Sequence, residues 1–371
     1  MEQTFAQLGI SEDLIRGLAE MGIETPTPIQ SKTIPLCLPR NKDLVGKAQT
    51  GTGKTAAYGL PLLMNLNPAH KAVQALVLCP TRELAQQVAK QLFKFTKYSD
   101  KVFIESVYGG EKIDIQINKL SRPTHVIVAT PGRLVDLMKR GIVSLNQVKT
   151  LVLDEADEML SMGFRKELDF ILKEAQHTQA RWLFSATIPP AVKDILNKHI
   201  SGSAHFIEIS PEKSVNPRIA HQYVMAEEDQ KLDMLLSFLR AHPDDRGIIF
   251  TRTKKASTLL HKQMEARNKT VGLLNGDMKQ VEREKVLRGF KNKSLQYVIA
   301  TDIAARGIDV AGLEFVVHYQ MPDQDDYYTH RAGRTARAGQ SGVSLVLASK
   351  QDLKAIKYLA KKLKISFSQV R

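Results

Sequence analysis

The chain has 371 residues, which is longer than one hydrophobic core usually supports and favours two domains of ordinary size. Hydrophobic residues make up 43% and charged residues 25%, a balance that excludes a largely disordered or low-complexity protein. The net charge of +14 favours a polyanionic partner, nucleic acid first, because each lysine or arginine that neutralises a phosphate releases a condensed counterion.

Cysteine usage and hydropathy exclude two further classes. Cys37 and Cys79 are far apart in the chain with no histidine at metal-ligand spacing nearby, so neither a disulfide framework nor a zinc site is expected. The first residues carry no basic segment followed by an apolar run, and no stretch is apolar for long enough to span a bilayer. These features predict a cytoplasmic protein with no membrane association.

Short apolar, β-branched runs alternate with longer amphipathic stretches, a pattern typical of a parallel sheet with crossover helices. In the first half, strands are predicted at residues 43–47, 74–79, 102–107, 125–129, 149–153 and 182–185. A polar segment bounded by prolines, residues 209–217, predicts a linker. In the second half, strands are predicted at residues 247–251, 271–274, 296–301, 314–319 and 343–347. The predicted α/β organisation is a domain over 1–209, a linker over 210–219 and a domain over 220–371.

The segment AQTGTGKT, residues 48–55, follows the first predicted strand and opens a predicted helix. Its backbone N–H groups and the positive end of the helix suit phosphate oxygens, as in a Walker A loop. Lys54 is expected to reach the β- and γ-phosphates of ATP, and Thr55 to ligate Mg²⁺. Ala48 stands where the strict pattern has glycine, so an ordinary glycine turn is the alternative for this segment.

The segment DEAD, residues 154–157, follows an apolar run typical of a central strand. Asp154 is expected to hold Mg²⁺ through water, and Glu155 to orient and deprotonate the attacking water. An acidic helix N-terminus is the alternative, because carboxylates also stabilise that end of a helix. The upstream Lys54 favours the catalytic interpretation.

With further motifs in the same order, the chain resembles the DEAD-box RNA helicases of superfamily 2, of bacterial type, over essentially its whole length. The other first-half motifs are GIETPTPIQ (22–30), PTREL (80–84), GG (109–110), TPGR (130–133) and SAT (185–187). The second-half motifs are QVER (280–283), ATDIAARGID (300–309) and HRAGRTAR (330–337). The resemblance implies two tandem RecA-like domains, each a mostly parallel sheet flanked by helices. It also implies RNA-stimulated ATP hydrolysis that drives local, non-processive unwinding or remodelling of RNA duplexes and RNA–protein complexes.

The resemblance assigns an ATP site to residues of both halves. Its cofactor-binding residues are Phe5, Thr25, Gln30, Gly51, Thr52, Gly53, Lys54, Thr55 and Asp309. Gln30 is expected to pair with the adenine edge through its amide, Phe5 to pack near the base, and Asp309 to contact the ribose. Arg334 and Arg337 are three residues apart and are expected to share a helix face and act as arginine fingers on the γ-phosphate. A solvated basic helix is the alternative for these arginines.

The resemblance also implies contacts with an RNA backbone. The residues are Arg82, Gly110, Thr130 and Arg133 in the first half, and Arg283 and Thr301 in the second. Thr130 and the following proline predict a helix start whose N–H groups can accept a phosphate. Such contacts position a strand without reading its bases, so binding is expected to be largely independent of sequence. A surface ion pair is the alternative for Arg82 and Arg133.

Coupling between ATP and RNA is implied for Ser185, Thr187, Arg306 and His330, although the two hydroxyls alternatively cap the following helix. Because carboxylates lie in the first half and arginines in the second, hydrolysis is expected to require the halves to close, with ATP and RNA raising each other's affinity. Two other functions stay open. One is a DNA translocase, and the other is an ATP-gated RNA clamp or chaperone with little unwinding.

Overall fold

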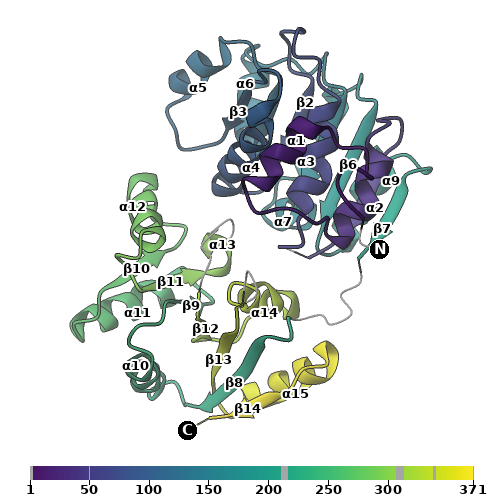
Figure 1. Cartoon of the computed structure of the whole chain (residues 1–371). Helices are drawn as coiled ribbons and strands as arrows, with labels where there is room; N and C mark the ends of the chain where they lie inside the picture. Colours follow the sequence, from purple (N-terminus) through teal and green to yellow (C-terminus); the bar gives the residue numbers. More distant parts are fainter. Residues whose placement is uncertain (1–2, 50, 210–215, 306–312, 337–339, 371) are drawn as a thin grey trace. The chain divides into compact units, whose positions relative to one another are not determined.

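The computed structural model describes residues 3–49, 51–209, 216–305, 313–336 and 340–370 (Figure 1). The chain divides into two compact units, unit 1 over Met1–Ser210 and unit 2 over Pro211–Arg371. Most of the predicted linker, residues 210–215, lies outside the described residues, and the first strand of unit 2 begins at Ile219. Among the described residues, each unit contains one parallel sheet of seven strands.

The sheet of unit 1 has the strand order β3-β4-β2-β5-β6-β1-β7. Its strands are β1 (Leu44–Lys47), β2 (Ala75–Leu78), β3 (Ile104–Val107), β4 (Val126–Ala129), β5 (Thr150–Asp154), β6 (Ala180–Ser185) and β7 (His205–Glu208). The helices between them are α1 (Glu12–Ala19), α2 (Pro28–Cys37), α3 (Lys54–Met64), α4 (Arg82–Phe95), the short 3-10 helix η1 (Thr96–Tyr98), α5 (Ile113–Leu120), α6 (Pro131–Lys139), α7 (Ala156–Ser161), α8 (Arg165–Glu174) and α9 (Pro190–His199).

The sheet of unit 2 has the order β10-β11-β9-β12-β13-β8-β14, which repeats the order of unit 1 strand for strand. Its strands are β8 (Ile219–Met225), β9 (Gly247–Thr251), β10 (Val271–Leu274), β11 (Tyr297–Thr301), β12 (Phe315–His318), β13 (Gly342–Ala348) and β14 (Phe367–Gln369). The helices are α10 (Lys231–Ala241), α11 (Lys254–Ala266), α12 (Gln280–Lys291), α13 (Asp302–Ala305), α14 (Asp325–Ala332) and α15 (Asp352–Leu363). The predicted fold class, two RecA-like α/β domains, is confirmed.

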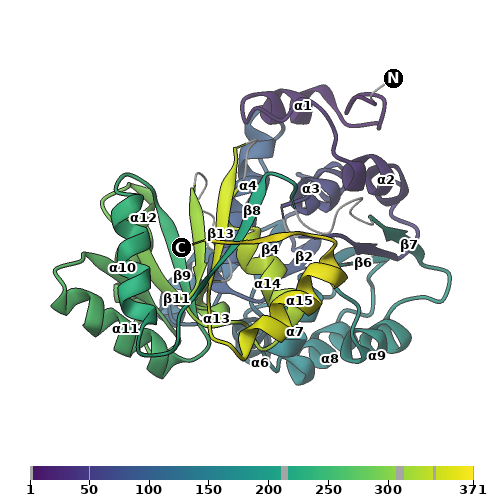
Figure 2. The ribbon, with the colours of Figure 1, turned by 90° about the horizontal axis from the view of Figure 1, so that it is seen from below.

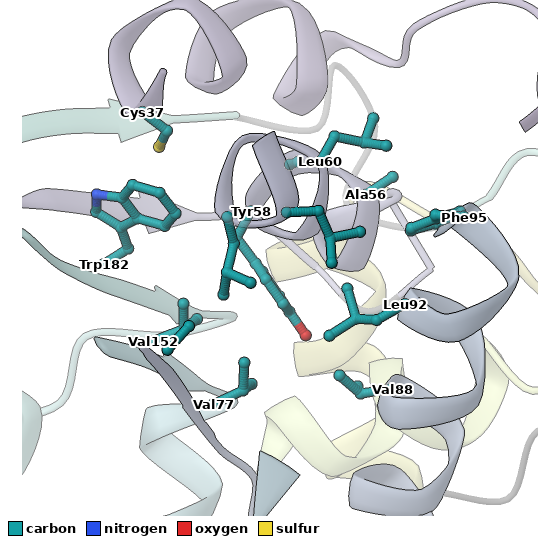
Figure 3. Close-up of a cluster of buried hydrophobic side chains, with 14 of the residues drawn as sticks. Cys37, Ala56, Tyr58, Leu60, Val77, Val88, Leu92, Phe95, Val152 and Trp182 are labelled. Atoms are coloured by element: carbon teal, nitrogen blue, oxygen red, sulfur yellow. The ribbon is translucent and has the colours of Figure 1, made fainter. Parts of the chain in front are cut away.

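Helices cover both faces of the unit 1 sheet because successive strand residues point to opposite faces. In β2, Ala75 and Val77 pack with α1 to α4, whereas Leu76 and Leu78 pack with helices α6 to α9. Figure 3 shows the first of these cores, where the helical Tyr58 lies over the strand side chains. Fully burying one such large apolar side chain contributes about 1.5–3 kcal/mol.

The sheet of unit 2 is covered in the same way (Figure 2). Helices α10 and α11 pack on one face, while α12, α13, α14 and α15 pack on the other. Again the two faces alternate along one strand: Ile249 of β9 joins the first core, and Ile248 joins the second. Among the residues that the structure describes, no helix is both long and apolar enough to cross a membrane.

All eleven strands predicted from the sequence are present, and three further strands were not predicted. These are β7, β8 and β14, which lie at the same end of their sheets. Strand β7 alternates between half-buried and exposed residues, β8 mixes buried and half-buried residues with one exposed residue, and β14 has two exposed residues of three, so none has the continuous apolar run of a central strand. The missed strands are therefore those that have no continuous apolar run.

Candidate functional site

The carboxyl ends of the strands in a parallel sheet lie along one edge, where functional loops of α/β proteins gather. In unit 1 the strand order places the segments after β5, β6 and β1 side by side. They carry residues 154–157, residues 185–187 and the phosphate loop of residues 48–55. The segments after β3, β4 and β2 form the other half of that edge. They carry the unit 1 residues predicted to bind RNA. The predicted ATP-site segments and the predicted RNA-binding segments of unit 1 therefore lie on separate halves of the edge.

The phosphate loop has the predicted strand–loop–helix form, running from β1 into α3. Gly51 and Gly53 have φ angles of 84° and 91°, a left-handed region that favours glycine. A Cβ at Gly53 would lie 2.4 Å from Gln30 Nε2, so the loop and the α2 segment approach more closely than a side chain allows. Lys54 begins α3 with 7% exposure, and its Nζ donates to Ala48 O at 3.1 Å.

The α2 segment is tied to the phosphate loop by Gln30. Its Nε2 donates to Gly53 O at 3.0 Å, and its Oε1 accepts from the N–H of Thr27 at 2.9 Å. The hydroxyl of Thr27 donates to Thr52 O at 2.8 Å. Each end of the Gln30 amide thus binds one protein group, which leaves one N–H and one lone pair of the amide for adenine; its pairing with adenine stays a prediction.

The other two residues predicted near the base differ in exposure. Phe5 is 2% exposed and belongs to the hydrophobic core that also contains Ile29 of α2. Thr25 is exposed in the segment before α2. Phe5 therefore supports the α2 segment from within the core, and contact of either residue with a nucleotide stays a prediction.

The acidic turn after β5 combines a buried carboxylate with a strained glutamate. Asp154 is 3% exposed, and its Oδ2 accepts a hydrogen bond from Tyr58 OH at 2.8 Å, while its Oδ1 accepts none from the described residues. Burial raises the pKa of Asp154, and the Lys54 ammonium opposes that shift. Glu155 has a φ of 54°, and such left-handed strain in a non-glycine residue tends to occur at functional sites.

Asp157 joins the acidic turn to the segment after β6. Its Oδ2 accepts from the N–H of Thr187 at 2.9 Å and from the hydroxyl of Thr187 at 2.8 Å. Its own N–H donates to Ser185 Oγ at 3.2 Å. Helix α9 has Pro189 at its N-cap and no side-chain cap, so the alternative that these hydroxyls cap the following helix is wrong. Their coupling role stays a prediction.

The other half of the edge carries a basic loop cluster, which comprises Arg82, Gly110, Thr130 and Arg133. Arg82 begins α4, and its guanidinium lies 5.4 Å from the ring centroid of Tyr108. Gly110 has a φ of 85°, and a Cβ there would lie 1.9 Å from Arg82 Nη2. Thr130 is the N-cap of α6 and is followed by a proline, which confirms the predicted helix start.

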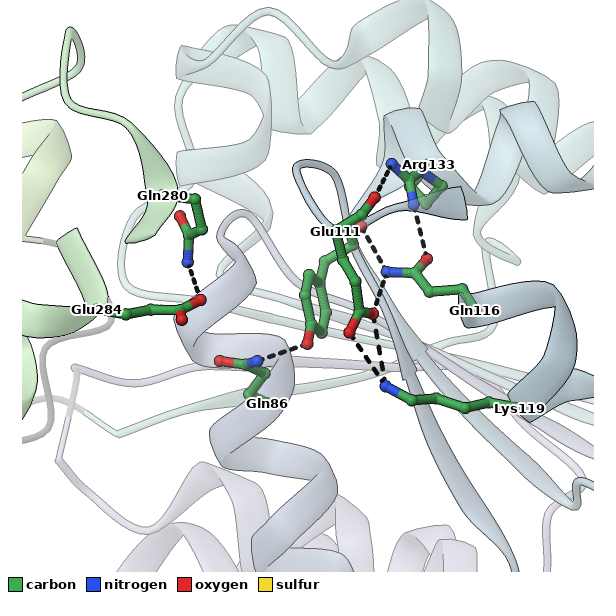
Figure 4. A network of polar contacts seen from close by, with 8 residues as sticks. Gln86, Glu111, Gln116, Lys119, Arg133, Gln280 and Glu284 are labelled. Carbon is green, nitrogen blue, oxygen red and sulfur yellow. Dashed lines mark hydrogen bonds and ion pairs between the residues drawn. The ribbon is translucent and has the colours of Figure 1, made fainter. Parts of the chain in front are cut away.

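Arg133, in the first turn of α6, is held by neutral oxygens (Figure 4). Its Nη1 donates to Gln116 Oε1 and its Nη2 donates to Glu111 O, each at 3.0 Å. Within the described ranges no carboxylate forms an ion pair with this guanidinium, so the surface ion-pair alternative is wrong for Arg133. Its charge is therefore not cancelled by a neighbouring acid.

In unit 2, the predicted RNA residues lie near the ends of neighbouring strands, β10 and β11. Arg283, on α12, donates from Nη2 to Ala304 O at 2.8 Å. Thr301 ends β11 with 7% exposure. The next residue, Asp302, accepts two hydrogen bonds of 2.6 Å from Arg331, which is 1% exposed. This buried pair joins the segment after β11 to helix α14.

The prediction that Arg334 lies on a helix face is wrong. Helix α14 ends at Ala332, so Arg334 lies beyond it, and His330 lies in its last turn. The N–H of Gly333 still donates to Thr329 O, but the N–H groups of Arg334 and Thr335 donate to Arg331 O and Ala332 O, three residues back, so the α-helical pattern stops before Arg334. Three predicted residues, Arg306, Asp309 and Arg337, lie outside the described residues, and their roles stay predictions.

The sequence analysis assigned no role to several residues that organise these sites. They are Thr27, Tyr58, Glu111, Gln116, Asp157 and Arg331. Asp157 and Arg331 lie inside recognised motifs, so their position was a usable signal. Tyr58 and Gln116 lie on helices as ordinary core and surface residue types, and only the packing of the fold brings them to the sites.

Comparisons with known proteins give two family matches, DEAD/DEAH box helicase at residues 27–195 and helicase conserved C-terminal domain at residues 230–339. The DEAD-box ATP-dependent RNA helicase CshA of Geobacillus kaustophilus is 38% identical over 368 residues, which are 99% of this chain and 78% of that protein. The protein of the same name from Bacillus cereus is 40% identical over 349 residues. The chain spans 66% of that protein's length.

Solved structures of similar fold include S. cerevisiae Dbp5 bound to RNA and ADP BeF3, with a TM-score of 0.88 and 29% identity, covering 99% of this chain and 95% of that chain. Mss116p bound to ssRNA and AMP-PNP has a TM-score of 0.87 and 26% identity, and the match covers 100% of this chain and 80% of that chain.

Two RecA-like domains, with a phosphate loop beside an acidic turn on the first, define an ATP-hydrolysing enzyme of the tandem-domain helicase class. The chain belongs to the DEAD-box ATP-dependent RNA helicases. The resemblance found in the sequence is therefore confirmed.

Proposed function

We propose that this helicase hydrolyses ATP in response to RNA and uses the cycle for local, non-processive unwinding or remodelling of RNA duplexes and RNA–protein complexes. The supporting observation is the divided edge of the unit 1 sheet. A phosphate loop and an acidic turn lie on one half, and a basic loop cluster lies on the other. The nucleotide chemistry and the strand-binding groups thus belong to one rigid sheet.

The ATP site would be built by the phosphate loop and the acidic turn. Lys54 would bind the β- and γ-phosphates, while Thr55 and Asp154 would hold Mg²⁺, which supplies positive charge to the phosphates. The fit to a cation is supported by the Asp154 Oδ1, a buried oxygen that accepts no hydrogen bond from the described residues. The described residues contain no group of three or more metal-ligating side chains, so water and phosphate oxygens would supply the other ligands.

Glu155 would orient and deprotonate the attacking water. It follows Asp154 at the end of β5, and its left-handed backbone turns the chain into α7. Arg334, in unit 2, would stabilise charge on the γ-phosphate as an arginine finger, together with Arg337.

RNA would bind through its backbone. The similar structures of Dbp5 and Mss116p hold RNA and ssRNA respectively, and the basic loop cluster supplies matching chemistry here. Arg133 offers a charge that no carboxylate among the described residues cancels, and the N–H groups of the first turn of α6 suit a phosphate. Arg283 and Thr301 would contact the strand from unit 2. A cytoplasmic location is consistent with the buried free thiols of Cys37 and Cys79.

The experiment that tests this function compares ATP hydrolysis with no nucleic acid, with single-stranded RNA and with DNA of matched sequence. RNA should stimulate hydrolysis, and matched DNA should stimulate it much less. Equal stimulation by DNA would refute the proposal in favour of a DNA translocase. Stimulation without separation of a short RNA duplex would favour a clamp.

The catalytic assignment is tested separately with Glu155→Gln. This variant should still bind ATP and RNA but should stall turnover, because the amide cannot accept the proton of the attacking water. Glu158, also acidic and three residues further on in α7, provides the control Glu158→Gln, which should keep turning over. Hydrolysis at the wild-type rate in Glu155→Gln would remove Glu155 as the base.

A further inference from the structure

A buried amide lies between a carboxylate and an arginine in the basic loop cluster. Gln116, on α5, is 1% exposed. Its Oε1 accepts from Arg133 Nη1 at 3.0 Å, and its Nε2 donates to Tyr108 O at 2.8 Å and to Glu111 Oε2 at 2.9 Å (Figure 4). Both amide hydrogens and the amide oxygen are therefore used inside the protein.

These partners allow only one orientation of the amide. A rotation by half a turn would place Oε1 against Tyr108 O and the Glu111 carboxylate, which only accept hydrogen bonds. It would also place the amide NH₂ against the guanidinium of Arg133, which only donates. The network thus presents the oxygen of Gln116 to the arginine and its nitrogen to the acid.

The same arrangement separates two groups of opposite charge. The Glu111 side chain binds Gln116 Nε2 and, at 3.2 Å, Lys119 Nζ. Arg133 meets the backbone oxygen of Glu111 and not its carboxylate. A carboxylate and a guanidinium attract each other strongly and often form two parallel hydrogen bonds. The amide of Gln116 lies where such a pair would otherwise form.

We infer that Gln116 is a positioning residue that keeps the Glu111 carboxylate from pairing with Arg133, so that the guanidinium stays available for an RNA phosphate. The inference rests on the proposed function, because it assigns Arg133 to the RNA backbone. If Glu111 paired with Arg133, the arginine's positive charge would be cancelled. Its binding to a phosphate would then release no counterion.

The first test removes the amide with Gln116→Met, which has a similar volume and no hydrogen-bonding hydrogens. Binding of a fluorescent single-stranded RNA is measured at several salt concentrations. The variant should bind RNA on the order of tenfold more weakly, because a charge-assisted contact is lost. The slope of log K against log salt should fall by about 0.7, the value for one phosphate contact with a single strand.

Rescue separates this role from general support of the fold. Adding Glu111→Gln to Gln116→Met should restore both the RNA affinity and the salt slope, because the competing charge is gone. Lys119→Met is the matched control: it removes another partner of the same carboxylate but touches neither Gln116 nor Arg133, so the slope should not change. Unchanged RNA binding in Gln116→Met, or weak binding that Glu111→Gln fails to rescue, would overturn the inference.

Glu111→Gln alone keeps the inference testable even if Gln116→Met does not fold. With Gln116 in place, this variant should leave the salt slope unchanged. A slope increase of about 0.7 would show that Glu111 already cancels the charge of Arg133 in the native protein, which contradicts the inference. Failure of the proposed function is recognised differently, because the wild-type protein itself would then show no RNA-stimulated hydrolysis.

Discussion

Tyr58→Phe removes one hydroxyl from the centre of unit 1 and leaves the packing nearly unchanged. Tyr58 OH donates to Asp154 Oδ2 at 2.8 Å, and both side chains are buried. Phenylalanine keeps the ring that lies 5.3 Å from the ring of Phe184. The substitution therefore creates no large cavity, and its effect reports the hydrogen bond to a buried carboxylate.

The expected cost is about 2–3 kcal/mol of unfolding free energy, the upper part of the range for hydrogen bonds to charged groups, because the acceptor stays buried. The cost depends on pH. Burial raises the pKa of Asp154 above its ordinary value of 3.8, so the native state loses stability as the pH rises from 3.8 through the folded pKa. Tyr58→Phe raises that folded pKa further, so its penalty should grow across this window and be constant above it.

Urea unfolding followed by tryptophan fluorescence measures this effect in unit 1 alone. Trp182 is the single tryptophan of the chain, is fully buried and lies in the same hydrophobic core as Tyr58. The assay is run from about pH 5 to about pH 8. Tyr108→Phe is the control, because its hydroxyl binds the neutral amide of Gln86 in the same unit.

Tyr108→Phe should cost only about 0.5–1.5 kcal/mol, with no dependence on the ionisation of Asp154. Two outcomes would refute the reasoning. One is a Tyr58→Phe penalty no larger than that of Tyr108→Phe, and the other is a penalty that shrinks as the pH rises.

Two further predictions concern the basic loop cluster and unit 2. Gly110→Ala should reduce RNA-stimulated hydrolysis, because its Cβ would displace the Arg82 guanidinium, whereas Gly109→Ala, with open space at its Cβ, should keep it. Burial lowers the pKa of His221 from 6.5 to about 4. The contribution of the neutral His221 to the free energy of unfolding is therefore fully present above pH 6.5 and is lost as the pH falls towards 4. His221→Gln should remove up to roughly 3 kcal/mol of this pH dependence, measured by urea unfolding followed by circular dichroism; an unchanged pH dependence would contradict the assignment.

The central strands and the motif positions could be predicted from the sequence because their signals are local. Residues 75–78 are continuously apolar, and the phosphate loop lies between the short strand β1, with its apolar Leu44 and Val45, and a helix. The edge strand β7, in contrast, alternates between half-buried and exposed residues, and its pairing with β1 depends on the rest of the sheet. Propensity alone could not identify it.

The side-chain partners of the site could not be predicted for the same reason. The adenine contact predicted for Gln30 stays a prediction, whereas its bond to the carbonyl of Gly53 depends on how the fold places α2 against the phosphate loop. Gln116 looks like a solvent-facing helix residue until α5 packs beside the Tyr108 segment. A helix was predicted to continue through Arg334, but after Gly333 the backbone hydrogen bonds run three residues back and no longer four.

The repeated strand order means that β8 in unit 2 corresponds to β1 in unit 1, and α10 corresponds to α3. Both helices begin with a buried lysine, Lys231 and Lys54. Gly51 and Gly53 stand three residues and one residue before Lys54, whereas Glu228 and Gln230 hold these places before Lys231, and Glu228 pairs with the Lys231 ammonium at 2.9 Å. Carboxylates at this position repel a triphosphate and use up the cation that would bind it. The strand order of unit 1 is therefore repeated in unit 2, but among the described residues the glycine-containing phosphate loop before α3 has no counterpart before α10.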